Sequence, residues 1–214
     1  MVRSSDDRSS TAERILDIAE RLVQTRGFNG FSYADISAEL GITKASLHYH
    51  FATKDELGSQ LIIRYCAAFA EALDTIDQAG GSAPGKLHAY AKLYENVLRE
   101  DRMCLCGMLA AESRTLSKAM QGHLHEFFVA NERWLARVVE QGRTSGELRF
   151  AGPAVDQARL LIVALEGAML VARGFADPSR FAGAAARLLE QMVAPKGGRP
   201  RGRPLDRARR RGGG

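Results

Sequence analysis

The sequence has little cysteine, little proline and no long apolar run. Its three cysteines are too few, and odd in number, for a disulfide scaffold, which favours a reducing compartment. The most apolar stretch, residues 160–172, is interrupted by Glu166 and is too short to span a bilayer. Residues 1–11 are mostly polar and charged, unlike a secretory signal peptide. We therefore expect a cytoplasmic protein with no membrane partner.

Most of the chain also lacks an excess of charge of one sign. The 214 residues carry a net charge of +5. Residues 196–214 contain eight basic residues and one acidic residue, a net charge of +7, so residues 1–195 carry −2. If the body of the chain binds nucleic acid, binding must depend on where particular side chains lie rather than on bulk charge.

Alternating runs of β-branched residues, which would indicate β-strands, are missing as well. Apolar residues recur instead every three or four positions, which predicts an all-α protein. Ser32 with Asp35 and Thr53 with Glu56 fit capping boxes at helix starts, and Gly27 is a usual residue just beyond a helix end. The expected helices cover residues 11–26, 33–40, 44–50, 54–76, 86–99, 106–118, 124–142, 154–173 and 178–193.

Residues 31–57 contain two short expected helices separated by a turn, Gly41-Ile42. This pattern is typical of a helix-turn-helix, whose second helix enters the major groove of DNA. The outward side of that second helix would offer hydrogen-bond donors, a small residue and no acid to repel phosphate. Its members are Lys44, Ala45, Ser46, His48, Tyr49 and His50. Ser32 and Lys54, each at a helix N-terminus, can add backbone N–H groups to a phosphate contact.

The run from Gly41 to Leu57, GITKASLHYHFATKDEL, resembles the DNA-binding domain of the TetR (tetracycline repressor) family of bacterial regulators. The residues that precede it share the resemblance: Ile15, Leu16, Ala19, Leu22, Gly27, Phe28, Phe31 and Ser32. The resemblance implies DNA contacts from Ser32, Tyr33, Lys44, Tyr49 and Lys54, with Thr43, Ala45 and Ser46 near base edges. His48 belongs to the same candidate surface, although the family usually has another aromatic residue there.

The resemblance also implies a division into domains. We expect an N-terminal three-helix helix-turn-helix DNA-binding domain in residues 1–57, with its core in 11–57. A C-terminal helical domain for ligand binding and dimerisation would follow in 58–195, and an Arg-rich tail without fixed structure in 196–214. The predicted function is a ligand-responsive transcriptional repressor that binds a double-stranded, inverted-repeat operator as a homodimer and is released by a small hydrophobic effector.

Two of the expected helices, 154–173 and 178–193, have more apolar circumference than one monomer core can cover. We predict that they form the dimer interface as a four-helix contact. The predicted lining of an effector pocket consists of aromatic and methionine residues, although such residues are more often plain core. The candidates are Tyr94, Met103, Met108, Phe127, Phe128, Trp134 and Met169. Glu112 and Glu166 are candidates to meet a polar group of the effector, or else to pair with Arg114 or Arg159.

Other functions receive less support from the sequence. Cys104 and Cys106, upstream of His123 and His125, are two residues apart and would point about 200° apart on a helix, so no metal or other cofactor is predicted. A thiol-based redox switch stays an alternative for these cysteines. A helical enzyme using His123 or His125 with Glu126 is a weaker alternative; no nucleophile elbow or phosphate loop is present, and no catalytic residue is predicted.

The tail raises a further alternative, a constitutive DNA-organising protein without an effector. Residues 198–204, GRPRGRP, resemble the AT-hook, whose Arg-Gly-Arg-Pro core lies in an AT-rich minor groove. Arg201 and Arg203 would supply the guanidinium groups, which the narrow groove of A-tracts attracts. The other interpretation is a basic tail that only improves solubility. A DNA-binding protein of either kind would be associated with the bacterial nucleoid.

Overall fold

The structure is a computed structural model that describes residues 10–194. Within these residues the chain forms nine α-helices, one 3₁₀ turn and a single isolated β-bridge between Leu148 and Val193. The all-α prediction is therefore confirmed. The elements are α1 (Thr11–Arg26), α2 (Tyr33–Leu40), α3 (Lys44–His50), α4 (Lys54–Gln78), α5 (Ala83–Arg99), α6 (Leu105–Ala111), η1 (Ser113–Thr115), α7 (Lys118–Thr144), α8 (Ala154–Gly174) and α9 (Ser179–Glu190). No helix in the described part of the chain is both long enough and apolar enough to cross a bilayer.

Local capping fixes the starts of the first four helices. The hydroxyls of Ser10, Thr43 and Thr53 each accept a hydrogen bond from a backbone N–H in the first turn of α1, α3 and α4. At α2 the carboxylate of Asp35 accepts hydrogen bonds from the backbone N–H and the hydroxyl of Ser32. Because these contacts lie within three residues of one another, the sequence predicts the helix starts directly.

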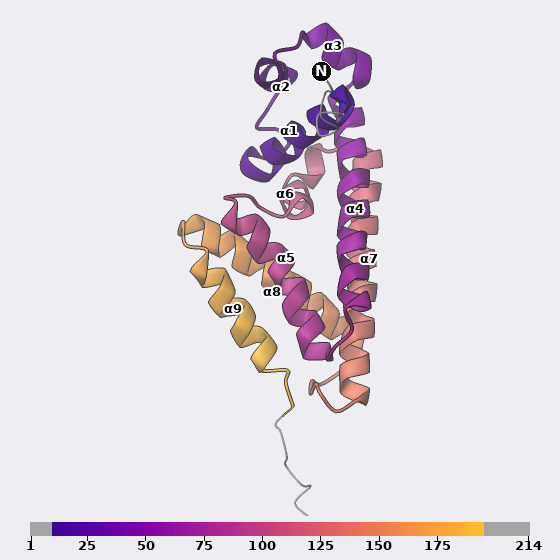
Figure 1. The fold of residues 1–214 in the computed structure, drawn as a ribbon, viewed down its shortest axis with the longest axis vertical. Coiled ribbons are helices and arrows are strands. Elements are labelled where there is room, and N and C mark those ends of the chain that lie inside the picture. The colour runs from indigo at the N-terminus through magenta and orange to yellow at the C-terminus, as the bar shows by residue number, and fades with distance from the viewer. Residues whose placement is uncertain (1–9, 195–214) are drawn as a thin grey trace, which may run out of the picture.

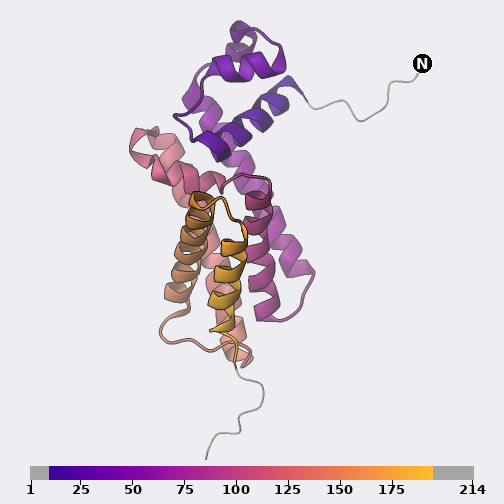
Figure 2. The same ribbon diagram turned by 90° about the vertical axis from the view of Figure 1, so that its left-hand side faces the viewer.

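The helices form an elongated molecule with the three short N-terminal helices at one end (Figure 1). Helix α4 begins there and continues into the rest of the molecule, where it packs against α7 (Figure 1). Helices α8 and α9 lie side by side and form an outer face (Figure 2). The predicted domain boundary at residues 57 and 58 falls inside α4. A movement of this helix would therefore displace residues in both predicted domains.

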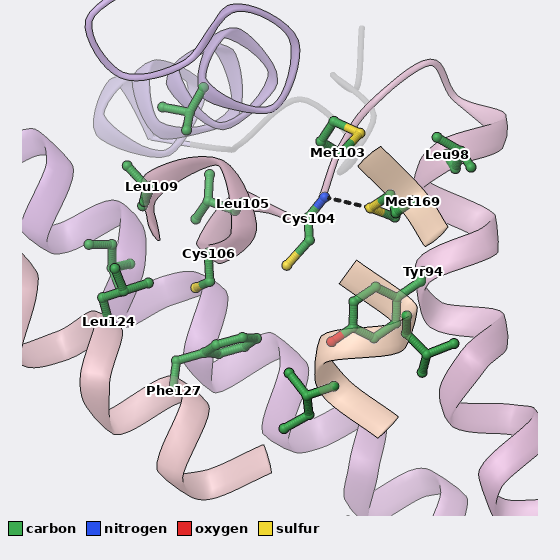
Figure 3. Packing of buried hydrophobic residues seen from close by; sticks show 14 of the residues in the cluster. Tyr94, Leu98, Met103, Cys104, Leu105, Cys106, Leu109, Leu124, Phe127 and Met169 are labelled. Atoms are coloured by element: carbon green, nitrogen blue, oxygen red, sulfur yellow. Dashed lines mark hydrogen bonds between the residues drawn. The ribbon is translucent and has the colours of Figure 1, made fainter. Parts of the chain in front are cut away.

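A buried cluster joins the two halves around α6. Met103, Cys104, Leu105 and Cys106 are all nearly inaccessible, and the backbone N–H of Cys104 donates to the sulfur of Met169 on α8 (Figure 3). This short helix packs against α1, α4 and α7, and its first turn also meets Met169 and Glu166 of α8. Its surroundings are mostly apolar, which makes any charged group nearby informative.

The bounds of several expected helices are wrong: α7 begins at Lys118 rather than at residue 124, and α9 ends at Glu190 rather than at residue 193. The helix expected at 106–118 ends at Ala111, because the chain turns through η1 and α7 then starts at Lys118 with the hydroxyl of Ser117 as its cap. Helix α5 starts at Ala83 rather than at residue 86, since Ser82 caps it and Pro84 fits the first turn, where no backbone donor is needed.

Candidate nucleic-acid interface

Helix α3 lies at the end of the molecule formed by the three short N-terminal helices (Figure 1), and its side chains divide into buried and exposed ones. Leu47 is the residue of α3 that is fully buried. Lys44, Ala45 and His48 are exposed, and Tyr49 is 87% exposed, the largest value among the large apolar and aromatic side chains of the described chain. An exposed aromatic ring and an exposed lysine on one helix that carries no acid are suited to contact DNA.

The turn between α2 and α3 holds the second helix at a fixed angle. Gly41 has a positive φ of 67°, a conformation that costs a side-chain-bearing residue energy. The backbone N–H of Ile42 donates to the carbonyl of Ser37, which closes the end of α2. Thr43 then caps α3 through a hydrogen bond from the N–H of Ser46. The predicted helix-turn-helix is thus present, with Thr43 and Ser46 at the N-terminal end of the exposed helix.

Tyr33 has a structural role in addition to its predicted DNA contact. Its ring is buried, its hydroxyl donates to the carbonyl of Phe51, and burial raises the pKa of Tyr33 to about 12. The ring of His48 packs on it at 4.8 Å between centroids, and Nδ1 of His48 hydrogen-bonds with the carbonyl of Ala52. Tyr33 therefore ties α2 to the end of α3, while DNA contacts from Tyr33 and His48 stay predictions.

The side chain of Lys54 points into the domain rather than to the surface. Its ammonium donates to the carbonyls of Phe28 and Phe31 and lies over both rings, 4.7 and 4.2 Å from the centroids. Partial burial lowers the pKa of Lys54. The sequence did not indicate this role, although the two aromatic residues before α2 were a usable signal. A phosphate contact from Lys54 stays a prediction, and its backbone N–H in the first turn of α4 is the group best placed to make it.

Ser32 is exposed at the N-terminus of α2, beside the same loop. Its two donors, the backbone N–H and the hydroxyl, are both directed at Asp35, and they lower the pKa of that carboxyl group. The hydroxyl must rotate away from Asp35 before it can donate to a phosphate. The predicted contact from Ser32 is therefore sterically open but has an internal competitor.

A set of polar contacts ties this DNA-facing end to the C-terminal helices. The carboxylate of Glu112, just after α6, accepts a hydrogen bond of 2.6 Å from the backbone N–H of Phe28. The side chain of Asn29 donates to the hydroxyl of Thr115 in η1, and Arg173 on α8 donates to the carbonyl of Thr25. The sequence suggested that Glu112 meets an effector or pairs with Arg114. Instead, Glu112 binds the backbone of the loop that follows α1.

The seven predicted pocket residues do not surround one cavity. Met103, Met108 and Phe128 line a groove of about 580 Å³ between α6, α7 and α8. Tyr94 and Met169 line a cavity of about 210 Å³ beside α4 and α5, and Phe127 lines a groove of about 360 Å³ between α4 and α7. Trp134 lines none of these three; its indole N–H donates to the carboxylate of Asp77.

Two of the three cysteines, Cys104 and Cys106, occupy surroundings that suppress their reactivity. Cys104 and Cys106 are buried, and burial raises the pKa of both thiols. Half-exposed Cys66 differs, because the neighbouring thiol of Cys106 lowers its pKa. Because the thiolate is the nucleophile, this conformation does not favour a switch at Cys104 or Cys106. Among residues 10–194, no three or more potential ligands of the His, Cys, Asp or Glu type cluster to hold a metal.

The exposed α3 and its helix-turn-helix, mounted on a helical C-terminal half, define a DNA-binding transcriptional regulator. A family model described as "Bacterial regulatory proteins, tetR family" matches residues 15–61. The structure superimposes on a TetR-family transcriptional regulator from Agrobacterium tumefaciens with a TM-score of 0.83 and 31% identity, over 86% of this chain and 97% of that one. A TetR transcriptional regulator from Legionella pneumophila gives a TM-score of 0.75 and 31% identity, over 87% and 99%. The chain belongs to the TetR family.

Curated relatives agree with this membership. The HTH-type transcriptional repressor NemR of Escherichia coli strain K12 is 28% identical over 170 residues, which is 76% of this chain and 84% of NemR. The HTH-type transcriptional repressor DhaR of Mycobacterium sp. strain GP1 is 23% identical over 168 residues, 76% of this chain and 82% of DhaR. Both of these relatives are thus named as repressors of transcription.

Proposed function

We propose that the protein is a homodimeric repressor that binds an inverted-repeat operator and is released by a small, largely apolar effector. The observation that carries the proposal is the pairing of an exposed reading helix with an exposed apolar face on α8. NemR and DhaR are both named repressors, which supports repression rather than activation. Such a protein would act on chromosomal DNA of the nucleoid, in the cytoplasm.

The dimer interface that we propose is the outer face of α8 and α9, shown in front in Figure 2. Val163 and Leu170 on α8 are 68% and 64% exposed, although they are apolar. Gly167 lies between them with open space where a side chain would be, so a partner backbone can approach closely. The other large apolar side chains exposed on or just after α8 are Val155, Leu160, Val171 and Phe175. An exposed apolar patch of this kind marks an interaction surface.

A symmetric dimer supports specific reading of DNA. One short helix such as α3 contacts only a few base pairs, whereas a two-fold pair reads two half-sites at a spacing set by the dimer. Lys44 and Ser46 lie in the first turn of α3, where side chains reach base edges. Backbone groups at the start of α2 and α4 would hold phosphates on either side.

Release would be mechanical. An effector between the C-terminal helices would shift α4 and α6, and α4 is joined to α3 by only Phe51, Ala52 and Thr53. The hydrogen bonds of Glu112 and Asn29 would pass a movement of α6 and η1 to the loop after α1. A change in the separation of the two reading helices then misaligns them with successive grooves. An effector with a differential affinity of about 3 kcal/mol would lower DNA affinity roughly 150-fold.

The tail adds a second proposed DNA contact. Arg201 and Arg203 lie outside the described residues, and the support for a minor-groove contact is the likeness of the sequence GRPRGRP to an AT-hook. A contact of this kind would act beside the operator once the helix-turn-helix has bound.

Footprinting on the DNA around its own gene, with and without cell extract, tests the proposed function. We expect a protected region with two-fold symmetry that disappears when extract supplies the effector. Protection that no extract removes would favour the constitutive DNA-organising alternative. Sedimentation in the absence of DNA should show a dimer, and a stable monomer at micromolar concentration would contradict the proposed interface.

A further inference from the structure

The wall of the groove between α6, α7 and α8 contains a carboxylate with one buried oxygen that has no hydrogen-bond partner within residues 10–194. The walls of this groove, about 580 Å³ in volume, are mostly apolar. That volume is within the range of ligand sites, whereas the cavity of about 210 Å³ beside α4 and α5 is small for one. Glu166, from the middle of α8, lines the groove, and its Oε1 is buried without a hydrogen-bond partner among the described residues.

The surrounding residues give this carboxylate its inward position. A side chain at Gly107 would place its first carbon 2.3 Å from Oε2 of Glu166, so the glycine on α6 makes room for the charge. The thiol of Cys104 lies near the carboxylate of Glu166 and opposes the rise in the pKa of Glu166 that burial causes. Cys104 itself lines the smaller cavity, so the pair forms part of the wall between the two spaces.

The other charged groups of the groove are already paired. Glu132 on α7 and Arg159 on α8 form an ion pair of 3.3 Å, and Arg159 also contacts Asp156. The sequence suggested Arg159 as a partner for Glu166, but the guanidinium is engaged elsewhere. One oxygen of the Glu166 carboxylate therefore lies buried in the wall of an apolar groove without a donor from the described part of the chain, and an unpaired buried charge is costly.

We propose that this groove binds an apolar organic cation, such as an amine on an aromatic or aliphatic body, with Glu166 as its counter-ion. The inference rests on the proposed function, because it names the chemical class of the effector. A cation would supply both a hydrogen-bond donor and an opposite charge, whereas an anion would be repelled and a neutral donor such as an alcohol would form only the weaker, uncharged hydrogen bond. Val163 and Leu170 line the outer side of the groove, so the proposed dimer would cover the bound ligand.

Calorimetric titration of the full-length protein with three probes of one shape tests this inference. The probes are naphthylmethylamine, naphthylmethanol and naphthoate, which differ in charge at neutral pH. We expect the amine to bind about tenfold more tightly than the alcohol, and the naphthoate to bind most weakly. In Glu166→Gln the amine should lose its advantage over the alcohol. In the matched variant Glu132→Gln, which removes the same charge from the paired site on the rim, the advantage should persist.

Three results would overturn the proposal. They are equal binding of amine and alcohol to the unaltered protein, an undiminished preference in Glu166→Gln, and no amine binding at millimolar concentration. Operator release by the same probes separates this inference from the proposed function. If the amine binds through Glu166 but the protein stays bound to the operator, effector release by this class of ligand is contradicted, whereas the proposed binding site is supported. If the alcohol releases the operator as well as the amine does, and Glu166→Gln does not change that release, effector release is supported and the preference for a cation is rejected.

Discussion

The two ends of the molecule differ in whether a buried charged group has hydrogen-bond partners. At the DNA-facing end, the ammonium of Lys54 is held by two carbonyls and two aromatic rings. In the C-terminal helices, Glu166 keeps one buried oxygen without a partner. A satisfied buried charge stabilises a fixed shape, whereas an unsatisfied one leaves an interaction for a ligand. The DNA-facing end thus resembles a rigid reading head, and the C-terminal end a receptor.

The chemical character of the exposed side chains also differs between the two ends. Helix α3 presents polar side chains and one tyrosine, as expected for a surface that meets phosphates and base edges. Helix α8 presents valine and leucine, as expected for a surface that meets a second copy of itself. The predictions below test each half of this comparison.

The largest effect should come from breaking the apolar face of α8. The double substitution Val163→Glu plus Leu170→Glu places charges in the proposed interface, where they would be desolvated without partners. We expect monomers in sedimentation and operator affinity reduced to that for random DNA, a loss of about 4 kcal/mol or more. Ile63→Glu, at an exposed apolar residue of α4 away from this face, is the control and should leave a dimer. Dimers in the double variant would rule out this face.

Base reading should be lost without loss of stability at the exposed start of α3. Lys44→Ala and Ser46→Ala each should cost about 1–3 kcal/mol of discrimination between operator and mismatched sites. Because Lys44 is exposed and Ser46 only half-buried, the free energy of unfolding should hardly change. Competition binding with mismatched operators measures the first quantity and urea denaturation the second. Unchanged discrimination in both variants would mean that α3 reads the operator through other residues.

Lys54 should show the opposite pattern. Lys54→Met keeps the aliphatic packing but removes the donors to the carbonyls of Phe28 and Phe31, and should lower the free energy of unfolding by about 1–3 kcal/mol. Under conditions where the variant is folded, the salt dependence of DNA binding separates the two roles. A slope smaller by about one would support a phosphate contact from the side chain, and an unchanged slope would limit Lys54 to its structural role.

The helix-turn-helix could be predicted closely from the sequence, whereas its connection to the rest of the molecule could not. The bounds of α3 follow from Thr43 and Gly41, whose contacts lie within a few residues. Glu112, by contrast, meets the N–H of Phe28, a residue 84 positions away, and no local pattern encodes that distance. Glu166 was noticeable as an acid in an apolar stretch, but only the fold shows that Arg159 is committed to other partners.

The connection through Glu112 should affect switching more than DNA binding. Glu112→Gln keeps the size of the side chain but replaces a charged acceptor at the N–H of Phe28 with a neutral one. We expect near-normal operator affinity and a weaker effect of the effector, with the coupling free energy smaller by about 0.5–2 kcal/mol. Operator titrations with and without effector give this coupling. Gln121→Glu, at a half-buried side chain bonded to nearby carbonyls, disturbs the same region without touching the loop after α1 and serves as the control. Equal loss of coupling in both variants would reject a specific role for Glu112.

The carboxylate of Glu166 should also make the free energy of unfolding depend on pH. Burial raises the pKa of Glu166 above its ordinary value of 4.5, so the native state keeps a proton where the unfolded chain has released it. Stability therefore falls as pH rises through the interval above that value. Nearby Cys104, Cys106 and Tyr65 all have raised pKa values and stay neutral there, and Glu132 and Arg159 are paired.

Glu166→Gln removes this titrating group. Compared with the unaltered protein, the variant should gain stability on the order of 1 kcal/mol near neutral pH and little or nothing at acidic pH. Urea denaturation at about pH 5 and about pH 8 measures the difference. A variant whose stability relative to the unaltered protein does not change between the two would show that Glu166 is not the titrating group.

The smallest effect should come from the tail, which follows the C-terminal helices yet is expected to help the DNA-facing end. If Arg201 and Arg203 enter a minor groove, Arg201→Ala plus Arg203→Ala should weaken binding mainly to operators flanked by A·T tracts, and should lower the salt slope by about two at most. Arg209→Ala plus Arg210→Ala removes the same charge outside the Arg-Gly-Arg-Pro core and should weaken binding less, to a similar extent on both flanks. Affinities of the two double variants on A·T-flanked and G·C-flanked operators, measured across a salt series, decide between the interpretations. If both variants lose the same affinity on both flanks, the tail attracts DNA through its charge alone, and base-specific contacts belong to the helix-turn-helix.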